Sequence, residues 1–169
     1  EPWVFGDPWT QRLKAAVMER YAILPYLYSL FREALDTGIP VMRPMWAEFP
    51  KDAECLTMDD QWMLGPALLV RPVWEEGAAS ASVFLPGGCS WYDTRSGKEA
   101  ASGSASTRHE VSATLDEGAP SFQRGGSIIP RKQRLRRSST TMRRDPYTLV
   151  VAPDLVGGTG AVGTLYLDD

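Results

Sequence analysis

The stretch LDEGAPSFQRGGSIIPR, residues 115–131, combines turn residues, a glycine pair and a short apolar run in one order. The turn residues at 116–120 break any preceding strand, because Asp, Gly and Pro favour turn conformations. The glycine pair at 125–126 permits backbone angles that other residues avoid. The two isoleucines at 128–129 then return to a core, and Pro130 is expected to end that strand. This order predicts an edge of a β-sandwich, not an active site.

The chain from residue 41 onward is typical of short strands separated by Gly, Pro or Ser. The predicted strands are residues 41–46, 62–64, 67–73, 81–85, 90–93, 109–115, 121–123, 127–129, 147–151 and 163–167. Polar and apolar residues alternate over 109–115, as they do in a strand with one wet face. Residues 97–106 and the basic run that ends at Arg144 are predicted to be loops. Many short strands favour an antiparallel sandwich over a parallel α/β sheet.

The first 39 residues are typical of a helix that a proline interrupts. Asp7 is expected to cap the helix and Pro8 to take its first position. Pro25 has no amide hydrogen to donate, so the helix should kink or restart there. The apolar stripe then continues to Gly38, which suits a helix end. The residues of this stripe are Leu13, Ala16, Val17, Tyr21, Leu24, Leu27, Leu30, Phe31, Ala34 and Leu35.

Composition and charge exclude several classes of function. The chain of 169 residues is 43% hydrophobic and 23% charged, which is typical of a globular domain, and its opening at Glu1 suggests part of a longer protein. A net charge of -3 gives no general attraction to nucleic acid or to an anionic membrane. The basic run within residues 131–144 carries no aromatic residue to stack on bases, so no nucleic-acid partner is predicted. No apolar stretch is long enough for a membrane span.

Residue types that carry chemistry occur in patterns that indicate structural roles. Three acidic pairs, Asp59-Asp60, Glu75-Glu76 and Asp168-Asp169, are adjacent in sequence. Neighbours on a strand point to opposite faces, so each pair is predicted to be solvated turn carboxylates. His109 is the only histidine and has no metal ligand or nucleophile at a suitable spacing, so an ordinary strand histidine is expected.

The two cysteines, Cys55 and Cys89, lie in separate segments with no CxxC spacing. They allow a disulfide without requiring one, and buried free thiols are the favoured interpretation.

The aromatic residues are open to two interpretations. They could stack on sugar rings as exposed platforms, or they could fill the interior between two sheets. Packing in the core is favoured, because large aromatic side chains bury large areas in sandwich interiors. The residues concerned are Trp46, Trp62, Trp74, Trp91 and Tyr92, whereas Trp3 and Trp9, just before the helix, are expected to pack at the rim of an adjoining barrel.

Ordered phrases across nearly the whole chain resemble glycoside hydrolase family 31, the α-glucosidase clan. The phrases are EPWVFGDPWTQRLKAAVMERYAILPYLYSLFREA, GIPVMRPMWAEFP, DDQWMLGPALLVRPV, SVFLPGG, WYDTRSG, APSFQRGGSIIP, DPYTLVVAP and GTLYLDD. The resemblance implies a mainly β fold, an antiparallel β-sandwich preceded by the last helix of a (β/α)8 barrel. It divides the chain into the kinked barrel helix (1–39), a proximal carboxy-terminal β-sandwich (40–164) and the start of a truncated distal sandwich (165–169).

The resemblance implies that the parent protein is a retaining, exo-acting α-glucosidase that releases terminal α-linked glucose. Such enzymes use two Asp residues, a nucleophile and a general acid/base. The family carries both upstream of this region, so no catalytic, cofactor-binding or metal residue is predicted in this chain, and no cofactor is expected. The chain alone is predicted to be structural and inactive. The alternative is a non-catalytic sandwich module that binds carbohydrate or protein.

Within the family, RPMWAEFP, RRSST with DPYTLVVA, and LYLDD resemble the neutral α-glucosidases that trim N-glycans. This subgroup implies a carbohydrate substrate, a location in the lumen of the endoplasmic reticulum and a lectin-like regulatory β-subunit as partner.

Overall fold

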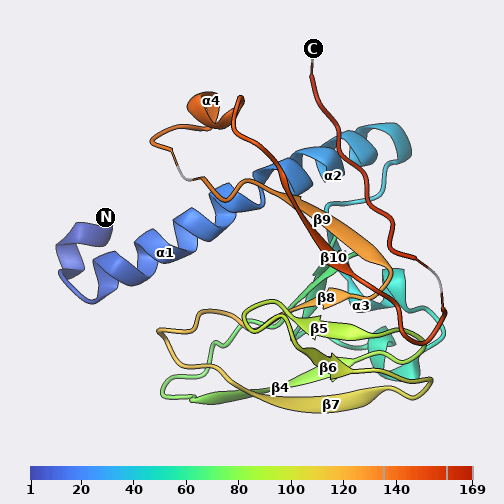
Figure 1. Cartoon of the computed structure of the whole chain (residues 1–169). Coiled ribbons are helices and arrows are strands. Elements are labelled where there is room, and N and C mark those ends of the chain that lie inside the picture. Colours follow the sequence, from blue (N-terminus) through green and yellow to red (C-terminus); the bar gives the residue numbers. More distant parts are fainter. Residues whose placement is uncertain (135, 159, 169) are drawn as a thin grey trace.

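The structure, a computed structural model, describes residues 1–134, 136–158 and 160–168. A helical arm at the amino terminus leads into a body of antiparallel sheets, and the carboxy-terminal segment runs back over the helices (Figure 1). Every pairing between named strands is antiparallel. The predicted fold class, a mainly β antiparallel sandwich preceded by a helix, is confirmed.

The helical arm contains a short 3-10 turn, η1 (Pro2–Phe5), followed by α1 (Trp9–Ala22) and α2 (Leu24–Thr37). The predicted restart at Pro25 is confirmed, since Ile23 separates the two helices and Pro25 lies in the first turn of α2. The end at Gly38 is also confirmed, because this residue adopts a left-handed conformation with φ of 78°. The prediction for the first cap is wrong. Pro8 occupies the cap position of α1, and no side chain caps it.

The central layer is a six-stranded sheet in the order β1-β2-β3-β8-β5-β6. Its strands are β1 (Met42–Pro44), β2 (Trp62–Leu64), β3 (Leu68–Val70), β5 (Trp91–Asp93), β6 (Glu99–Ala101) and β8 (Ser121–Arg124). The strand β8 therefore lies inside this sheet, between β3 and β5. The first half of the stretch at 115–131 is an interior strand, although an edge was predicted.

A two-stranded sheet of β4 (Ser80–Leu85) and β7 (Thr107–Ser112) covers one face of the central layer (Figure 1). The core between them contains fully buried Trp91, Phe122 and Met63 from the central sheet, with Val83 and Leu85 from β4. Alternate residues of each strand point to opposite faces, so a three-residue strand such as β3 contributes Leu69 to this core.

The opposite face of the central sheet packs on α2 and on a third sheet, β9 (Ser127–Arg131) with β10 (Thr148–Ala152). Leu68 points to this side, where it joins Tyr26, Leu30 and Ile129 in a second apolar cluster. The Tyr26 hydroxyl donates to the carbonyl of Leu64 at 2.8 Å and accepts from the amide of Ala67. The helix α2 is therefore fastened to the sandwich by both apolar and polar contacts.

Several predicted boundaries differ from the structure. The strand predicted at 41–46 ends at Pro44, where α3 (Met45–Glu48) begins, and the 3-10 turn η2 (Ala53–Leu56) follows it. The loop predicted at 97–106 contains β6. In the strand predicted at 163–167, the described residues form no strand, and one isolated bridge joins Val162 to Ser127.

Pro130 does not end its strand, because β9 continues to Arg131 and Pro130 pairs with Leu149. Among the described residues, Pro130 has a strand partner on one side only, which is where a strand tolerates proline.

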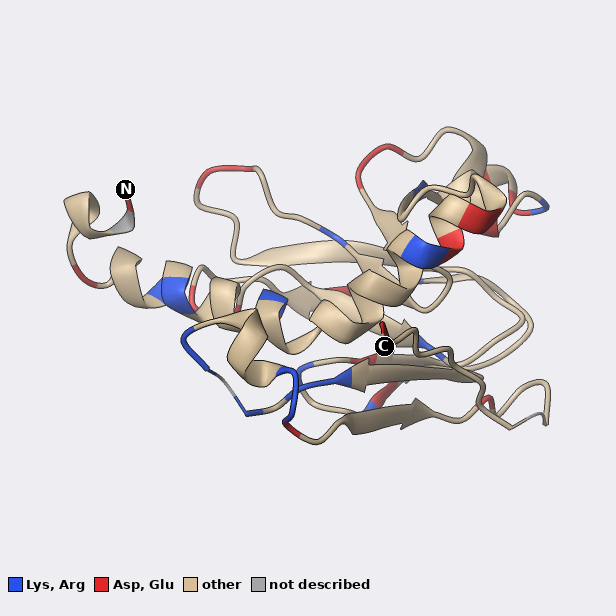
Figure 2. Ribbon diagram, turned by 90° about the horizontal axis from the view of Figure 1, so that it is seen from above, with Lys and Arg blue, Asp and Glu red and all other residues tan. Residues whose placement is uncertain are grey.

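The basic run is more ordered than predicted. It contains a one-turn helix, α4 (Ser139–Met142), whose cap residue Ser138 accepts from the amide of Thr141. Lys132 is only 5% exposed, and Asp145 and Met142 are buried too. Figure 2 shows Lys and Arg following one another along this loop after β9. Local composition predicted exposure, but three residues turn inward. Lys132 donates to backbone carbonyls, Asp145 accepts from Arg136, and the Met142 side chain is buried.

Candidate functional site

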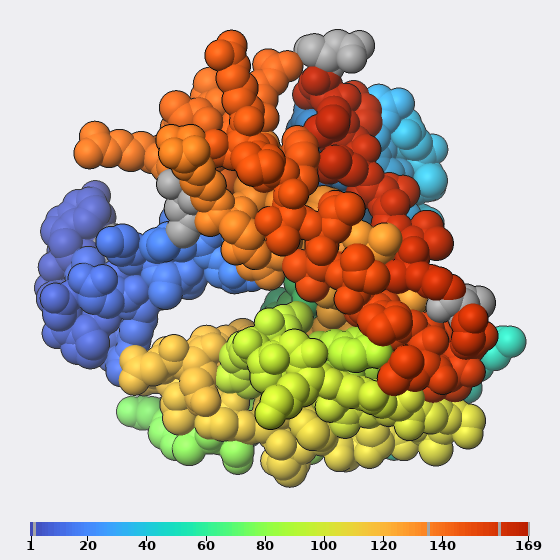
Figure 3. All heavy atoms as spheres, viewed as in Figure 1, coloured from blue at the N-terminus to red at the C-terminus, as the bar shows by residue number. Residues whose placement is uncertain are grey.

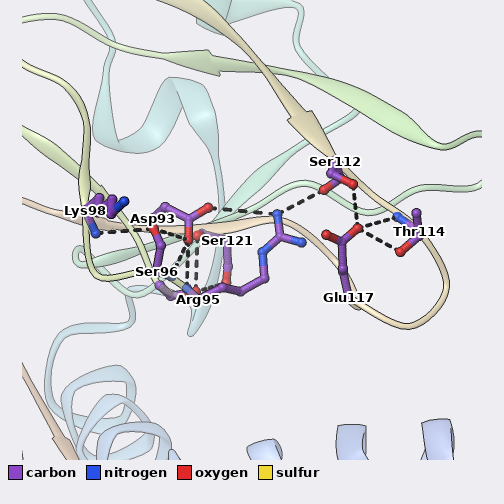
Figure 4. Close-up of polar contacts among 9 residues, drawn as sticks. Asp93, Arg95, Ser96, Lys98, Ser112, Thr114, Glu117 and Ser121 are labelled. Carbon is purple, nitrogen blue, oxygen red and sulfur yellow. Dashed lines mark hydrogen bonds and ion pairs between the residues drawn. The ribbon is translucent and has the colours of Figure 1, made fainter.

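A cluster of hydrogen-bonded polar residues joins two loops at one end of the sandwich (Figure 4). One loop follows β5 and the other follows β7. The residues that form this polar cluster are Asp93, Arg95, Ser96, Lys98, Ser112, Thr114, Glu117 and Ser121. It contains two carboxylates with an arginine between them. Whether either carboxylate could act as an acid or a base depends on the hydrogen bonds that it forms.

One carboxylate oxygen of Glu117 accepts three hydrogen bonds. Its Oε2 accepts from the Ser112 hydroxyl at 2.6 Å, the Thr114 hydroxyl at 2.7 Å and the Thr114 amide at 3.0 Å. These bonds favour the charged form and lower the pKa of Glu117 to about 2. A glycosidase acid needs a raised pKa to remain protonated near neutral pH. Glu117 is therefore a loop anchor and unsuited to proton donation.

Asp93 anchors the neighbouring turn. Its Oδ1 accepts from the amides of Arg95 and Ser96 at 2.9 and 2.8 Å, which is the geometry of a turn closed by a side chain. Arg95 approaches Asp93 at 3.9 Å and donates to the carbonyl of Ser112 at 3.0 Å. The arginine thus ties the two loops together. The polar cluster therefore stabilises loop conformation, and both of its carboxylates are engaged in holding the loops.

The acidic pairs occupy the turn and surface positions predicted for them. Asp59, Glu75 and Glu76 are exposed, and Asp60 lies 3.2 Å from Arg71. Asp168 accepts from the Tyr28 hydroxyl, and this bond, with a second from Tyr166, lowers the pKa of Asp168. Asp169 lies outside the described residues.

His109 lies on β7 with its ring nearly perpendicular to that of Phe122, at a centroid distance of 6.0 Å and an interplanar angle of 87°. The prediction of an ordinary strand histidine is confirmed by this packing. Across residues 1–134, 136–158 and 160–168, no group of three His, Cys, Asp or Glu side chains is arranged to hold a metal ion. In the same ranges, no helix is long and apolar enough to cross a membrane.

The two cysteines are free and buried, as favoured from the sequence. Burial is the main cause that raises the pKa of Cys55 to about 11, and burial also raises the pKa of Cys89. Thiols with raised pKa values carry little thiolate near neutral pH, so neither cysteine is suited to nucleophilic catalysis.

The aromatic residues divide between core and surface. Trp91 is completely buried, and its indole donates to the carbonyl of Pro86 at 2.8 Å. Trp46 and Trp74 are 52% and 59% exposed, so the prediction that they fill the core is wrong for these two. Trp74 packs under the guanidinium of Arg71, 4.9 Å from its ring centroid. An exposed tryptophan offers a flat apolar face, which is what a sugar ring requires.

The glycine pair at 125–126 forms one wall of a cleft of about 750 Å³, with α2 opposite. The charged residues of the cleft on α2 are paired within the protein. Arg32 lies 2.9 Å from Asp36, and Glu33 lies 3.1 Å from the buried Arg43. The third carboxylate of the described lining, Asp154, accepts from the amides of Ser90 and Val156, so each described carboxylate of the cleft has a partner within the protein.

The geometry defines a class of protein: an antiparallel β-sandwich with interlocked loops, preceded by a helical arm. The sequence profile described as "Glycosyl hydrolase family 31 C-terminal domain" matches residues 38–129. The chain belongs to glycosyl hydrolase family 31.

Known relatives match this chain over its whole length. The "Probable glucan 1,3-alpha-glucosidase" of Oryza sativa subsp. japonica is 51% identical over 169 residues, and "Neutral alpha-glucosidase C" of Mus musculus is 46% identical over 170 residues. In each case the alignment covers 100% of this chain and 18% of the relative. The chain therefore spans less than a fifth of the length of these relatives.

Solved structures agree in fold. The "glucosidase II alpha subunit (alpha3-Glc2-bound from)" superposes with a TM-score of 0.93 at 34% identity, covering 100% of this chain and 18% of that one. The catalytic subunit in the "ER glucosidase II heterodimeric complex consisting of catalytic subunit and the binding domain of regulatory subunit" gives 0.92, also at 34% identity and with the same coverage. The resemblance to family 31 and to its neutral α-glucosidases is confirmed.

Proposed function

We propose that this chain is the part of a retaining, exo-acting α-glucosidase that braces the catalytic barrel without contributing catalytic residues. In this proposal, residues 1–39 are the final barrel helix, 40–164 the proximal sandwich and 165–169 the start of a distal sandwich. The two catalytic Asp residues lie elsewhere in the parent protein. Support comes from the likeness of the whole chain to named α-glucosidases and from the paired state of the two carboxylates Glu33 and Asp36 of α2, which line the cleft.

The observation that supports the bracing role is the exposed apolar face of α1. Trp9, Leu13 and Val17 are 43%, 41% and 54% exposed, although they follow helical spacing on one face. This helix touches the sandwich at few points, such as Arg12 with Asp116 at 2.7 Å. Figure 3 shows α1 (blue) standing away from the body of the molecule. A helix with one uncovered apolar face is expected to pack on another body, which we infer to be the barrel.

For the parent enzyme we propose terminal α-1,3-linked glucose on immature N-glycans as the substrate. We also propose a location in the lumen of the endoplasmic reticulum and a lectin-like regulatory subunit as partner. The names of similar proteins support this proposal for the substrate, the location and the partner, since they include a probable glucan 1,3-alpha-glucosidase and an ER glucosidase II complex. No cofactor is expected, because two carboxylates are sufficient for retaining hydrolysis.

The test is to express the complete parent protein and to follow the hydrolysis of α-1,3-, α-1,4- and α-1,6-linked glucose disaccharides by NMR. We expect the α-1,3 disaccharide to be preferred and the first product to be the α-anomer of glucose. Release of the β-anomer would refute retention, and a preference for another linkage would refute the substrate. Replacing Leu13 and Val17 with Asp should lower the parent's stability, whereas the matched exposed change Leu115→Asp should not. Equal stability of the two variants would refute the brace.

The exposed tryptophans favour one rival function, a module that binds carbohydrate without catalysis. Trp46 and Trp74 could each stack on a sugar ring. Calorimetric titration of the chain with glucose disaccharides distinguishes the two functions. Saturable binding that is lost in Trp74→Ala would support the module, and no binding at millimolar sugar would exclude it.

A further inference from the structure

The basic loop of residues 132–147 joins β9 to β10 and contains α4 (Figure 1). Lys132, its first residue, is only 5% exposed, although lysine side chains are rarely buried. The Lys132 ammonium donates to the carbonyls of Met142, Arg143 and Asp145 at 2.5, 2.9 and 2.8 Å. A primary ammonium has three hydrogens and no acceptor, so these three carbonyl oxygens match its donors one for one.

An aromatic ring faces the same ammonium. The ring centroid of Tyr147 lies 4.3 Å from the Lys132 Nζ, a distance at which the face of the ring attracts a cation. The three carbonyl oxygens and this ring all belong to residues 142–147, and we call them the ammonium cage. Lys132 reaches the cage from the other end of the loop, so the cation and the groups that bind it come from separate parts of the chain.

The cage is held in place by contacts that do not involve the Lys132 side chain. The amide of Asp145 donates to the carbonyl of Met142 at 3.0 Å, which closes the turn that carries the carbonyls. The Asp145 carboxylate accepts from Arg136 at 2.9 and 2.7 Å. The backbone of Lys132 is fixed separately, since its amide donates to the carbonyl of Ala22 at 2.8 Å. Removing the Lys132 side chain would therefore remove the cation and leave these supports of the cage.

The chemistry of the cage selects one class of cation. Mg²⁺ requires octahedral oxygen ligands at about 2.0–2.1 Å, and Ca²⁺ requires about six to eight oxygens. Three neutral carbonyls at 2.5–2.9 Å meet neither requirement. The carboxylate of Asp145 supplies no free negative charge, because it pairs with Arg136. A guanidinium is planar and cannot direct its hydrogens at three oxygens around one point. A primary ammonium satisfies the cage.

We propose that residues 142–147 form a binding site for a primary ammonium group, which the native chain fills with its own Lys132. Shortening this side chain to Ala removes the atoms from Cγ to Nζ, and these are the non-hydrogen atoms of n-propylammonium. The vacated site should therefore bind n-propylammonium from solution. The proposal concerns a site within this chain and does not depend on the glucosidase activity proposed above.

The test uses Lys132→Ala in the 169-residue chain. Titration with n-propylammonium chloride should shift the NMR amide and carbonyl resonances of residues 142–147 in a saturable manner, which gives a Kd. Hydrogen–deuterium exchange of the same residues measures loop opening. A ligand that binds only the closed loop lowers the open population by the factor 1 + [L]/Kd. At ten times the Kd, the loop amides should exchange about 11-fold more slowly, whereas amides of β4 and β7 should not change.

Matched controls separate the site from general effects of the amine. Neutral n-propanol has the same length but one hydroxyl hydrogen, and potassium chloride has the charge without N–H donors. Each should leave exchange of the loop within about twofold. Lys132→Met keeps a side chain that reaches the position of Cε and leaves no room for n-propylammonium, so this variant should not respond. The native chain and Lys51→Ala, which removes an exposed lysine, should not respond either.

The absence of saturable binding to Lys132→Ala would overturn the proposal. Equal protection by n-propanol or by potassium chloride would also overturn it, because recognition would not depend on a primary ammonium. Equal protection of Lys132→Met would show that the amine acts elsewhere. If Lys132→Ala is unfolded in buffer, recovery of the native circular dichroism by n-propylammonium but not by n-propanol supports the proposal, and failure to recover it contradicts the proposal.

Discussion

Replacing Lys132 with Met tests whether one buried ammonium organises the whole basic loop. Met keeps the apolar stem but removes the charge, so three carbonyl oxygens lose their donor. The ammonium also lies 4.3 Å from the ring centroid of Tyr147. Each hydrogen bond to a charged group contributes about 1.5–3 kcal/mol, and this contribution is reduced because burying the ammonium costs solvation. We expect a net local loss of about 3 kcal/mol.

This loss should open the loop and leave the sandwich folded, since β9 and β10 pair independently of the ammonium. The equilibrium for opening should then shift by about 100-fold, because 1.4 kcal/mol corresponds to about a factor of ten. Limited digestion with trypsin measures this shift, as cleavage of a transiently open segment follows its population. Cuts after Arg137, Arg143 and Arg144 should appear about 100-fold faster in the variant. Cleavage after Lys132 itself is excluded from the comparison.

Two further variants make the test decisive. Lys51→Met removes an exposed lysine and should leave the cleavage rate of the loop unchanged. Lys132→Arg keeps the charge, but a planar guanidinium cannot direct three hydrogens at three carbonyls that converge on one point, so protection should be only partly restored. If Lys132→Met digests at the rate of the parent, or if Lys132→Arg is fully protected, the ammonium does not organise the loop as argued.

Three other outcomes are expected. Gly65→Ala should destabilise the chain by about 2–5 kcal/mol in chemical denaturation, because its Cβ would meet Leu30 and Tyr26 at 2.5 Å and φ is +59°. Gly97→Ala, also at positive φ but in open space, should cost only about 1–2 kcal/mol, and equal costs would contradict the steric argument. Cys55, with a pKa of about 11, should resist alkylation at pH 8 until the chain is unfolded, as followed by mass spectrometry. Glu117 should titrate near pH 2 in an NMR experiment. Because folding lowers the pKa of Glu117, its contribution to stability is present above the unfolded pKa and is lost as the pH falls towards 2. A normal titration midpoint would refute the role of Glu117 as a loop anchor.

The sequence allowed the fold class and the main helix restart to be predicted, because both depend on local signals. Proline at 25 has one physical consequence in a helix, and short runs between turn residues have few alternatives to strands. The boundaries were less accurate where tertiary contacts determine them. Residues 163–167 alternate like a strand, but the segment runs beside α2, where the amide of Tyr166 donates to the Ser29 hydroxyl.

Buried polar side chains were the features that sequence reasoning missed. Gln61 is 3% exposed, and its amide exchanges two hydrogen bonds with the backbone of Phe84, at 2.7 and 2.9 Å. Arg43 is 4% exposed and contacts Glu33 on α2 and Glu48 on α3. The sequence around each residue does not predict its burial. A polar side chain is buried where it finds a hydrogen-bond or ion-pair partner, and here that partner is remote in the chain or lies on another element. The same reason explains why Lys132 was predicted to be exposed.

The glycine pair at 125–126 connects the central sheet to the layer formed by β9 and α2. Gly125 leaves little room for a side chain, because a Cβ would lie 3.0 Å from the carbonyl oxygen of Pro153 and from Ser90, and these neighbours would have to shift to accept it. Gly126 has a different requirement, a φ of +78°. Between them the chain leaves β8, inside the central sheet, and enters β9, which packs on α2. A shift of this turn would therefore move the helix relative to the sandwich. If α1 and α2 dock on a catalytic barrel as proposed, these two glycines set the angle at which the sandwich meets it.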